Sequence, residues 1–199
     1  MTTSHWLDLA ALVPLGLSGG SAAVRKGMDM YGAMVLAVVT GLGGGLAADL
    51  LVGLTPRVFQ DDRLLLLSAG CGIVAFMAGL PMLTRWHRTI HYLDAFGLGL
   101  YAVAGAQRGI NAGVSLTGVV FLGVVAGSGG GMLRDVLAGE IPYVLRREIY
   151  ALAAVGGALF YGLAVREWGE AAWLGLTAAG LVTTVRIVAI RLGLNAPTA

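Results

Sequence analysis

Two aspartates in this chain stand where a carboxylate could meet a cation inside a membrane, because each follows a glycine triplet in an apolar stretch. One motif consists of Gly43, Gly44, Gly45 and Asp49; the other, 86 positions later, consists of Gly129, Gly130, Gly131 and Asp135. Residues 32–58 and 118–144 agree at 13 of 27 positions. An ionisable group within a membrane is a candidate functional group, since it costs about 3 kcal/mol or more at the bilayer centre. The duplication therefore predicts a transport pathway rather than a folding core.

The glycines suggest how such a pathway would offer ligands. Each glycine weakens a helix by about 1 kcal/mol relative to alanine, so we expect each triplet to break its helix and expose backbone carbonyls. Such breaks persist in a membrane only where protein or a watery cavity satisfies the freed groups. The hydroxyls of Thr40 and Ser128, just before the triplets, add oxygen ligands of the kind that hard cations prefer.

A second interpretation of the triplets needs no ligand. Small residues spaced four apart let two membrane helices approach closely. Gly41 with Gly45, and Gly127 with Gly131, have that spacing. Because both copies of the motif also carry an aspartate and a proline, we favour the pathway interpretation.

The two copies differ at one position that matters for the pathway. Arg134 stands where the first copy has Ala48. It is adjacent to Asp135, so we expect the two side chains not to share a helix face. Arg134 is then expected either to pair with Asp49 across the repeats or to place a fixed positive charge in the pathway.

Two further groups of polar residues are candidates. Asp8 and Asp94 are related by the same 86-residue offset, and a position at a helix start would explain them through the helix dipole. Arg186 lies beside Thr183 and Thr184 in the last apolar stretch. A role in the pathway competes there with snorkelling of Arg186 to the membrane surface, which we favour slightly.

The composition requires these residues to sit on membrane helices. The chain is 57% hydrophobic and 12% charged, against about 25% charged in soluble domains. We predict an all-α integral membrane protein, because no strand-like alternation is present. Seven spans of roughly the required length are expected. They are 6–24, 31–54, 64–84, 92–108, 115–139, 148–166 and 171–190.

The offset groups these spans into a single membrane domain, 1–199, with internal symmetry. Repeat one covers 6–84, repeat two covers 92–166, and a seventh helix covers 171–190. Three helices is an odd number, so the second repeat must enter the membrane from the opposite side and the repeats are inverted. Lys and Arg number seven on one side against four on the other. The positive-inside rule then places the N-terminus outside and the C-terminus in the cytoplasm, within the inner (plasma) membrane.

Several classes of protein are disfavoured. No nucleophile and base pair or metal cluster stands out, so we expect neither an enzyme nor a bound metal or cofactor. The basic residues are dispersed, which argues against a nucleic-acid partner. Membrane lipids are the expected partners of the basic loops.

Beyond the residue chemistry, the sequence resembles the prokaryotic trimeric intracellular cation (TRIC) channels, a family also labelled as glycine transporters. The resemblance covers about 6–190, with the second motif the more specific. It is carried by Tyr31-Gly32, Gly43–Gly45, Asp49, Asp94–Leu98, Gly129–Pro142 and Arg146–Ala151. It departs at Ala47 and Ala48, where family members often have a basic residue before the first aspartate.

The resemblance implies a fold and an activity. Seven helices would form two inverted three-helix repeats plus one, assembled as a homotrimer with a pore in each protomer. The pore would pass monovalent cations, chiefly potassium, between second and fifth helices that the glycines bend. The alternative is a secondary transporter for glycine or another small zwitterion, whose carboxylate Arg134 would bind.

Overall fold

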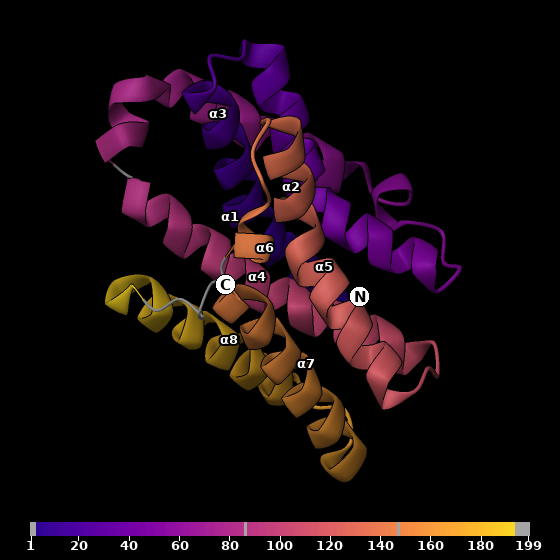
Figure 1. Cartoon of the computed structure of the whole chain (residues 1–199). Coiled ribbons are helices and arrows are strands. Elements are labelled where there is room, and N and C mark those ends of the chain that lie inside the picture. The colour runs from indigo at the N-terminus through magenta and orange to yellow at the C-terminus, as the bar shows by residue number, and fades with distance from the viewer. Residues whose placement is uncertain (1–2, 86, 147, 194–199) are drawn as a thin grey trace.

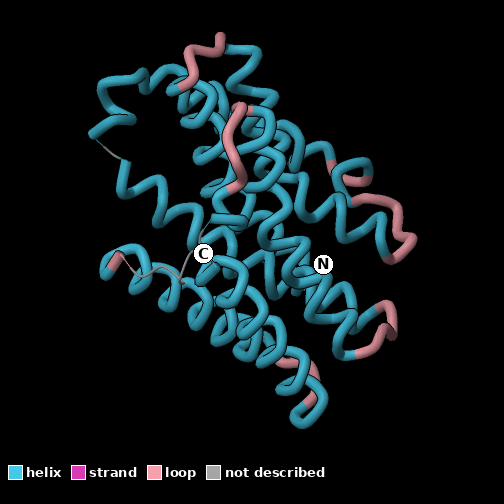
Figure 2. Tube along the Cα trace, in the orientation of Figure 1, coloured by secondary structure: helices cyan, strands magenta, loops and turns pink. Residues whose placement is uncertain are grey.

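The chain forms a bundle of long helices. The computed structural model describes residues 3–85, 87–146 and 148–193, and these ranges contain no β-strand. Figure 2 shows short loops between the helices. Seven helices have 21 to 25 residues: α1 (Thr3–Arg25), α2 (Met30–Leu51), α3 (Asp62–Arg85), α4 (His87–Asn111), α5 (Leu116–Leu137), α7 (Glu148–Trp168) and α8 (Ala172–Leu192). The short elements are the 3-10 helix η1 (Arg57–Phe59) and the helix α6 (Tyr143–Arg146).

Each predicted span coincides with one long helix, but the helices differ in polarity. Six of them, all except α4, are long and apolar enough to cross a membrane within the described residues. α4 is long enough to cross a membrane, since its 25 residues span about 37 Å at 1.5 Å per residue. It differs from the other six long helices in being too polar to count as an apolar span. Its middle is nevertheless deeply buried, with Val103, Ala104 and Ala106 in the largest apolar cluster.

Equivalent positions of the two copies build equivalent helix ends. The side chain of Asp29 caps α2 by accepting from the amide of Gly32 at 2.8 Å. Ser115, 86 positions later, caps α5 by accepting from the amide of Gly118 at 3.3 Å. Side-chain caps of this kind satisfy amides that the first helical turn leaves free. The sequence repeat is thus repeated in local structure.

The glycine triplets lie where α2 crosses α5. A side chain at Gly44 would collide with the carbonyl of Ala126, and one at Gly130 would collide with the carbonyl of Thr40. These two contacts are related by the 86-residue offset, since position 126 corresponds to position 40. Both helices remain α-helical through residues 43–45 and 129–131. The expected break in each helix is therefore wrong, and at Gly44 and Gly130 the missing side chain permits close packing of the two helices.

Within the described residues, the helix with an interrupted backbone is α3, for which no break was expected. In α3, Gly79 has φ 70° and ψ 167°, and Pro81 follows two residues later. Positive φ strains residues with a Cβ, which explains a glycine at this point. α3 packs on α1 and α2, while α7 and α8 lie side by side at the other end of the bundle (Figure 1).

Candidate functional site

The first cluster of buried charges joins α1, α2 and α4, and we call it the Arg108 cluster. Arg108 Nε donates to Asp49 Oδ1 at 2.6 Å, and its Nη2 donates to both oxygens of Asp8 at 2.9 Å. Arg57 Nη1 donates to Asp8 Oδ2 at 2.7 Å. The side chains of Asp8, Asp49 and Arg108 are 2–3% exposed. Two carboxylates thus meet two guanidinium groups in this cluster.

The second cluster joins α1, α4 and α5, and we call it the Arg134 cluster. Arg134 Nη1 donates to Asp94 Oδ1 and to Ser18 Oγ, both at 2.6 Å. Its Nε donates to Asp135 Oδ1 at 2.9 Å. The side chains of Arg134, Asp94 and Asp135 are 10–13% exposed, so this cluster is less sealed than the first. Here two carboxylates meet one guanidinium group directly.

The aspartate of each motif also holds the loop that follows its helix. Asp49 Oδ2 accepts from the amide of Arg57 at 3.1 Å, and Asp135 Oδ2 accepts from the amide of Tyr143 at 2.7 Å. Arg57 and Tyr143 are 86 positions apart, each directly after the proline of its motif. The conformations that follow the triplets are therefore alike in the two copies.

These contacts correct three expectations. Asp8 and Asp94 do not rely on a helix dipole, because each lies inside its helix and binds an arginine. Arg134 does not pair with Asp49, which binds Arg108 from the other repeat. Arg134 and Asp135 do interact, since the flexible arginine side chain folds back to reach its neighbour.

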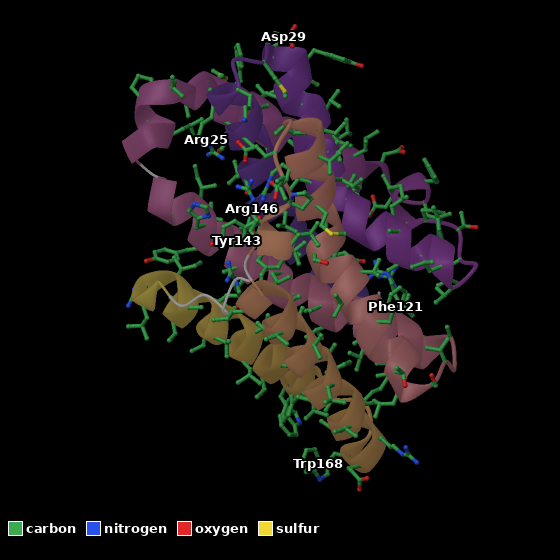
Figure 3. All side chains as sticks on the ribbon, viewed as in Figure 1. Arg25, Asp29, Phe121, Tyr143, Arg146 and Trp168 are labelled. Atoms are coloured by element: carbon green, nitrogen blue, oxygen red, sulfur yellow. The ribbon has the colours of Figure 1, made fainter. Side chains whose placement is uncertain are left out.

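Access to the two clusters is unequal. A cavity of about 390 Å³ reaches the Arg134 cluster, whereas the space beside the Arg108 cluster is about 20 Å³. The larger cavity is lined by Ser18, Ala22, Arg25, Lys26, Ile90, His91, Asp94, Arg134, Asp135, Ala138, Glu140, Ile141, Tyr143 and Arg146. Figure 3 shows Arg25, Arg146 and Tyr143 grouped where the link between α5 and α7 crosses the bundle. A solute can therefore reach the Arg134 cluster directly.

A salt bridge spans part of this cavity's lining. Lys26 Nζ lies 2.7 Å from Glu140 Oε1, which links the end of α1 to the loop after α5. The hydrogen bond from Lys26 lowers the pKa of Glu140 from its usual range. Glu140 is thus a carboxylate at neutral pH and balances one of the basic residues around the cavity.

The candidate hydroxyls are bonded within their own helices. Thr40 Oγ1 donates to the carbonyl of Leu36 and Ser128 Oγ donates to that of Val124, both at 2.6 Å. Such bonds leave the hydroxyl oxygen able to accept but commit its proton. The carbonyl of Gly41, the residue after Thr40, is also engaged, because it accepts a hydrogen bond from the hydroxyl of Tyr101 at 2.7 Å.

The candidates on α8 separate in space. Thr183 donates to the carbonyl of Ala179 at 2.8 Å, and Thr184 is exposed on the outer surface of the bundle. Arg186 is 4% exposed, so the snorkelling that we favoured is wrong. Its guanidinium lies over the rings of Tyr150 and Tyr143.

The sequence alone did not identify five of the residues at these sites, namely Arg108, Arg57, Ser18, Tyr143 and Tyr150. Arg108 is the last residue of the predicted span 92–108, and the repeat contains a signal that its helix continues further. Gly27 follows α1 with φ 72°, and Gly113, at the equivalent position, follows α4 with φ 67°. Aligning the two helix ends would have placed Arg108 one turn inside α4.

Comparison with known sequences finds relatives over most of the chain. A family model described as glycine transporter matches residues 5–79 and 91–166. A UPF0126 membrane protein of Deinococcus radiodurans is 42% identical over 156 residues, which are 77% of this chain and 73% of that protein. The UPF0126 inner membrane protein YadS of Escherichia coli K12 is 33% identical over 202 residues, covering 98% and 95% of the two chains.

Comparison with solved structures shows the same architecture. A TRIC cation channel superposes with a TM-score of 0.89 at 30% identity, covering 98% of this chain and 96% of the other. The TRIC trimeric intracellular cation channel orthologue from Rhodobacter sphaeroides gives a TM-score of 0.87 at 34% identity, covering 98% of this chain and 100% of the other.

Proposed function

This chain belongs to the family of the TRIC cation channels, whose sequence model is described as glycine transporter, and from that premise we propose that it is a potassium-permeable channel for monovalent cations. One observation carries the proposal: a pair of buried carboxylates lies on each side of the α2 and α5 crossing, and a cavity of about 390 Å³ reaches one pair. The pathway would run inside each protomer along α2 and α5. We assign it no enzymatic reaction and no cofactor, with K⁺ or Na⁺ as cargo.

Charge indicates where a cation would be attracted. The Arg134 cluster has two carboxylates and one directly paired arginine, so its local balance favours a cation. The Arg108 cluster has two of each and is sealed. A cation entering from the cavity would compete with Arg134 for Asp94 and Asp135. In the described conformation, the proposed pathway would be closed at the Arg108 cluster, because that cluster is sealed from solvent.

Helix packing supports the proposed topology of seven membrane spans. In this topology α4 is also a span, although its polar residues make it less apolar than the other six. α1 packs on α4 and α2 packs on α5, so equivalent helices of the two repeats meet. The paired contacts of Gly44 and Gly130 are those expected from a two-fold axis in the membrane plane. We propose two inverted three-helix repeats, α1 to α3 and α4 to α7 with its short α6, followed by α8.

The orientation we propose has the N-terminus outside and the C-terminus in the cytoplasm. Arg57 and Arg108, two of the four basic residues counted on the N-terminal side, bind aspartates inside the protein. This leaves Arg63 and Arg166 there against seven on the other side, which favours the positive-inside assignment. The large cavity would open to the cytoplasm. An inner-membrane homotrimer surrounded by lipid is the assembly we propose from the family.

A second candidate function is transport of glycine or another small zwitterion. The description of the matching family model favours it, and the cavity presents both Arg134 and carboxylates to a zwitterion. Arg134 is already bound to Asp94 and Asp135, which leaves it poorly placed to bind a substrate carboxylate. We therefore rank transport second.

Liposomes containing the purified full chain separate the two functions. An imposed membrane potential is expected to drive potassium flux that requires no other solute, and labelled glycine is not expected to accumulate. Protein-free liposomes give the leak. Saturable glycine uptake coupled to an ion gradient, without voltage-driven potassium flux, would overturn the channel proposal in favour of the transporter.

A further inference from the structure

Arg186 is a buried charge on the helix that lies outside the 86-residue repeat. Its side chain comes from α8 and is 4% exposed. Its Nε has no hydrogen-bond partner, and no carboxylate among the described residues lies within 4 Å of it. A guanidinium buried in this way is costly unless something offsets its charge. The residue therefore requires an explanation beyond packing.

Two aromatic rings hold this guanidinium. Arg186 Cζ is 4.8 Å from the centroid of the Tyr150 ring and 5.4 Å from that of Tyr143. Both distances are within the range of a cation–π interaction. The two rings meet edge to face with centroids 6.0 Å apart, so they form one platform for the charge.

The same two tyrosines are part of the Arg134 cluster. The amide of Tyr143 donates to Asp135 Oδ2 at 2.7 Å. Tyr150 is 3% exposed and lines, together with Arg134 and Asp135, a narrow gap beside the cluster. Each ring that contacts Arg186 thus belongs to a residue that also adjoins the charged groups of the cluster.

The repeat explains why a charge is needed there. Tyr143 occupies the position of Arg57, which supplies the Arg108 cluster with its second positive charge. The Arg134 cluster lacks that charge at the equivalent position. Arg25 and Arg146 line the cavity, but both are exposed, so solvent screens them. Arg186 is the buried cation on the remaining side.

We propose that Arg186 is the second cation of the Arg134 cluster and sets how strongly this cluster attracts permeating cations. It acts through the Tyr143 and Tyr150 platform rather than by binding a carboxylate, and α8 thereby supplies a charge that the second repeat has lost. The proposal rests on the proposed channel function and deepens it.

The first test removes the charge and keeps the volume. In Arg186→Met, the potassium concentration that gives half-maximal conductance is expected to fall roughly three- to tenfold, because one unit of repelling charge is gone. Arg186→Lys keeps the charge over the rings and is expected to restore the wild-type value. Arg191→Met is the matched control, since Arg191 lies on the same helix over the Tyr92 ring at 5.8 Å but is exposed.

The second test moves the charge to the place where the first repeat has it. Tyr143→Arg combined with Arg186→Met is expected to bring the half-maximal concentration back toward wild type. An unchanged value in Arg186→Met, or an equal change in Arg191→Met, overturns the proposal while leaving the channel intact. Failure of the double variant to move back also overturns it.

A readout that needs no conduction separates this proposal from the channel itself. In protein labelled with 3-fluorotyrosine, Arg186→Met is expected to shift the ¹⁹F resonances of Tyr143 and Tyr150, assigned with Tyr→Phe variants. Arg191→Met is expected to shift Tyr92 instead. If wild type passes no potassium, the channel proposal fails whatever the spectra show; if the two resonances do not move, the assignment of Arg186 fails whatever the currents show.

Discussion

Replacing Gly44 by valine is expected to cost at least about 4 kcal/mol of unfolding free energy, in the range reserved for severe steric or electrostatic damage. A Cβ at this position collides with the backbone carbonyl of Ala126 and lies 3.3 Å from the amide nitrogen of Gly130. Backbone atoms cannot rotate away as a side chain can, so α2 and α5 must separate. Reversible unfolding in mixed detergent micelles measures the change.

Two other helical glycines provide the control. Gly70 on α3 and Gly180 on α8 have no atom within 4 Å of an added Cβ. Valine at either position is expected to change stability by less than about 1 kcal/mol, because only helix propensity is altered. Equal tolerance of valine at positions 44 and 70 would show that the α2 and α5 crossing is not the tight contact described above.

The glycines also show what the sequence could and could not predict about the fold. The all-helical fold and the approximate positions of the long helices followed from apolar lengths, because a membrane helix must bury its backbone groups over a fixed thickness. The role of the triplets did not follow, because glycine both weakens a helix and permits close approach. Only the position of Ala126 and Thr40 on the facing helices decides between these effects, and no local pattern specifies that position.

Loss of the arginine in the sealed cluster is the second large effect expected. Arg108→Met leaves Asp49 without its arginine and Asp8 with Arg57 alone, both nearly excluded from solvent. Removing one partner of a buried ion pair costs about 3–5 kcal/mol, because the remaining charge is uncompensated. The same micelle unfolding measurement is expected to show a loss of this size.

Two further variants make that result specific to charge. Arg108→Met with Asp49→Asn removes one charge of each sign and is expected to recover part of the lost stability. Arg166→Met removes an exposed arginine and is expected to change little. A double variant no more stable than Arg108→Met alone would contradict the ion-pair explanation.

The clusters were only half predictable from the sequence. Asp8, Asp49, Asp94 and Asp135 stood out because a carboxylate in an apolar stretch is costly and because the offset paired them. The pairing did not follow: Arg108 was missed, and Arg134, which also stood out, binds Asp94 and Asp135 rather than Asp49. Which arginine reaches which aspartate is set by helix packing, and Arg186 reaches its cluster only through two rings.

The reversal potential in a potassium chloride gradient tests the central claim most directly, namely that the carboxylates of the Arg134 cluster select cations for conduction. Wild-type channels in planar bilayers are predicted to reverse close to the potassium equilibrium potential. Asp94→Asn with Asp135→Asn keeps the shapes but removes both charges, and is predicted to move the reversal potential toward that of chloride. A wild-type reversal near the chloride equilibrium potential, or an unchanged value in the double variant, would contradict the account.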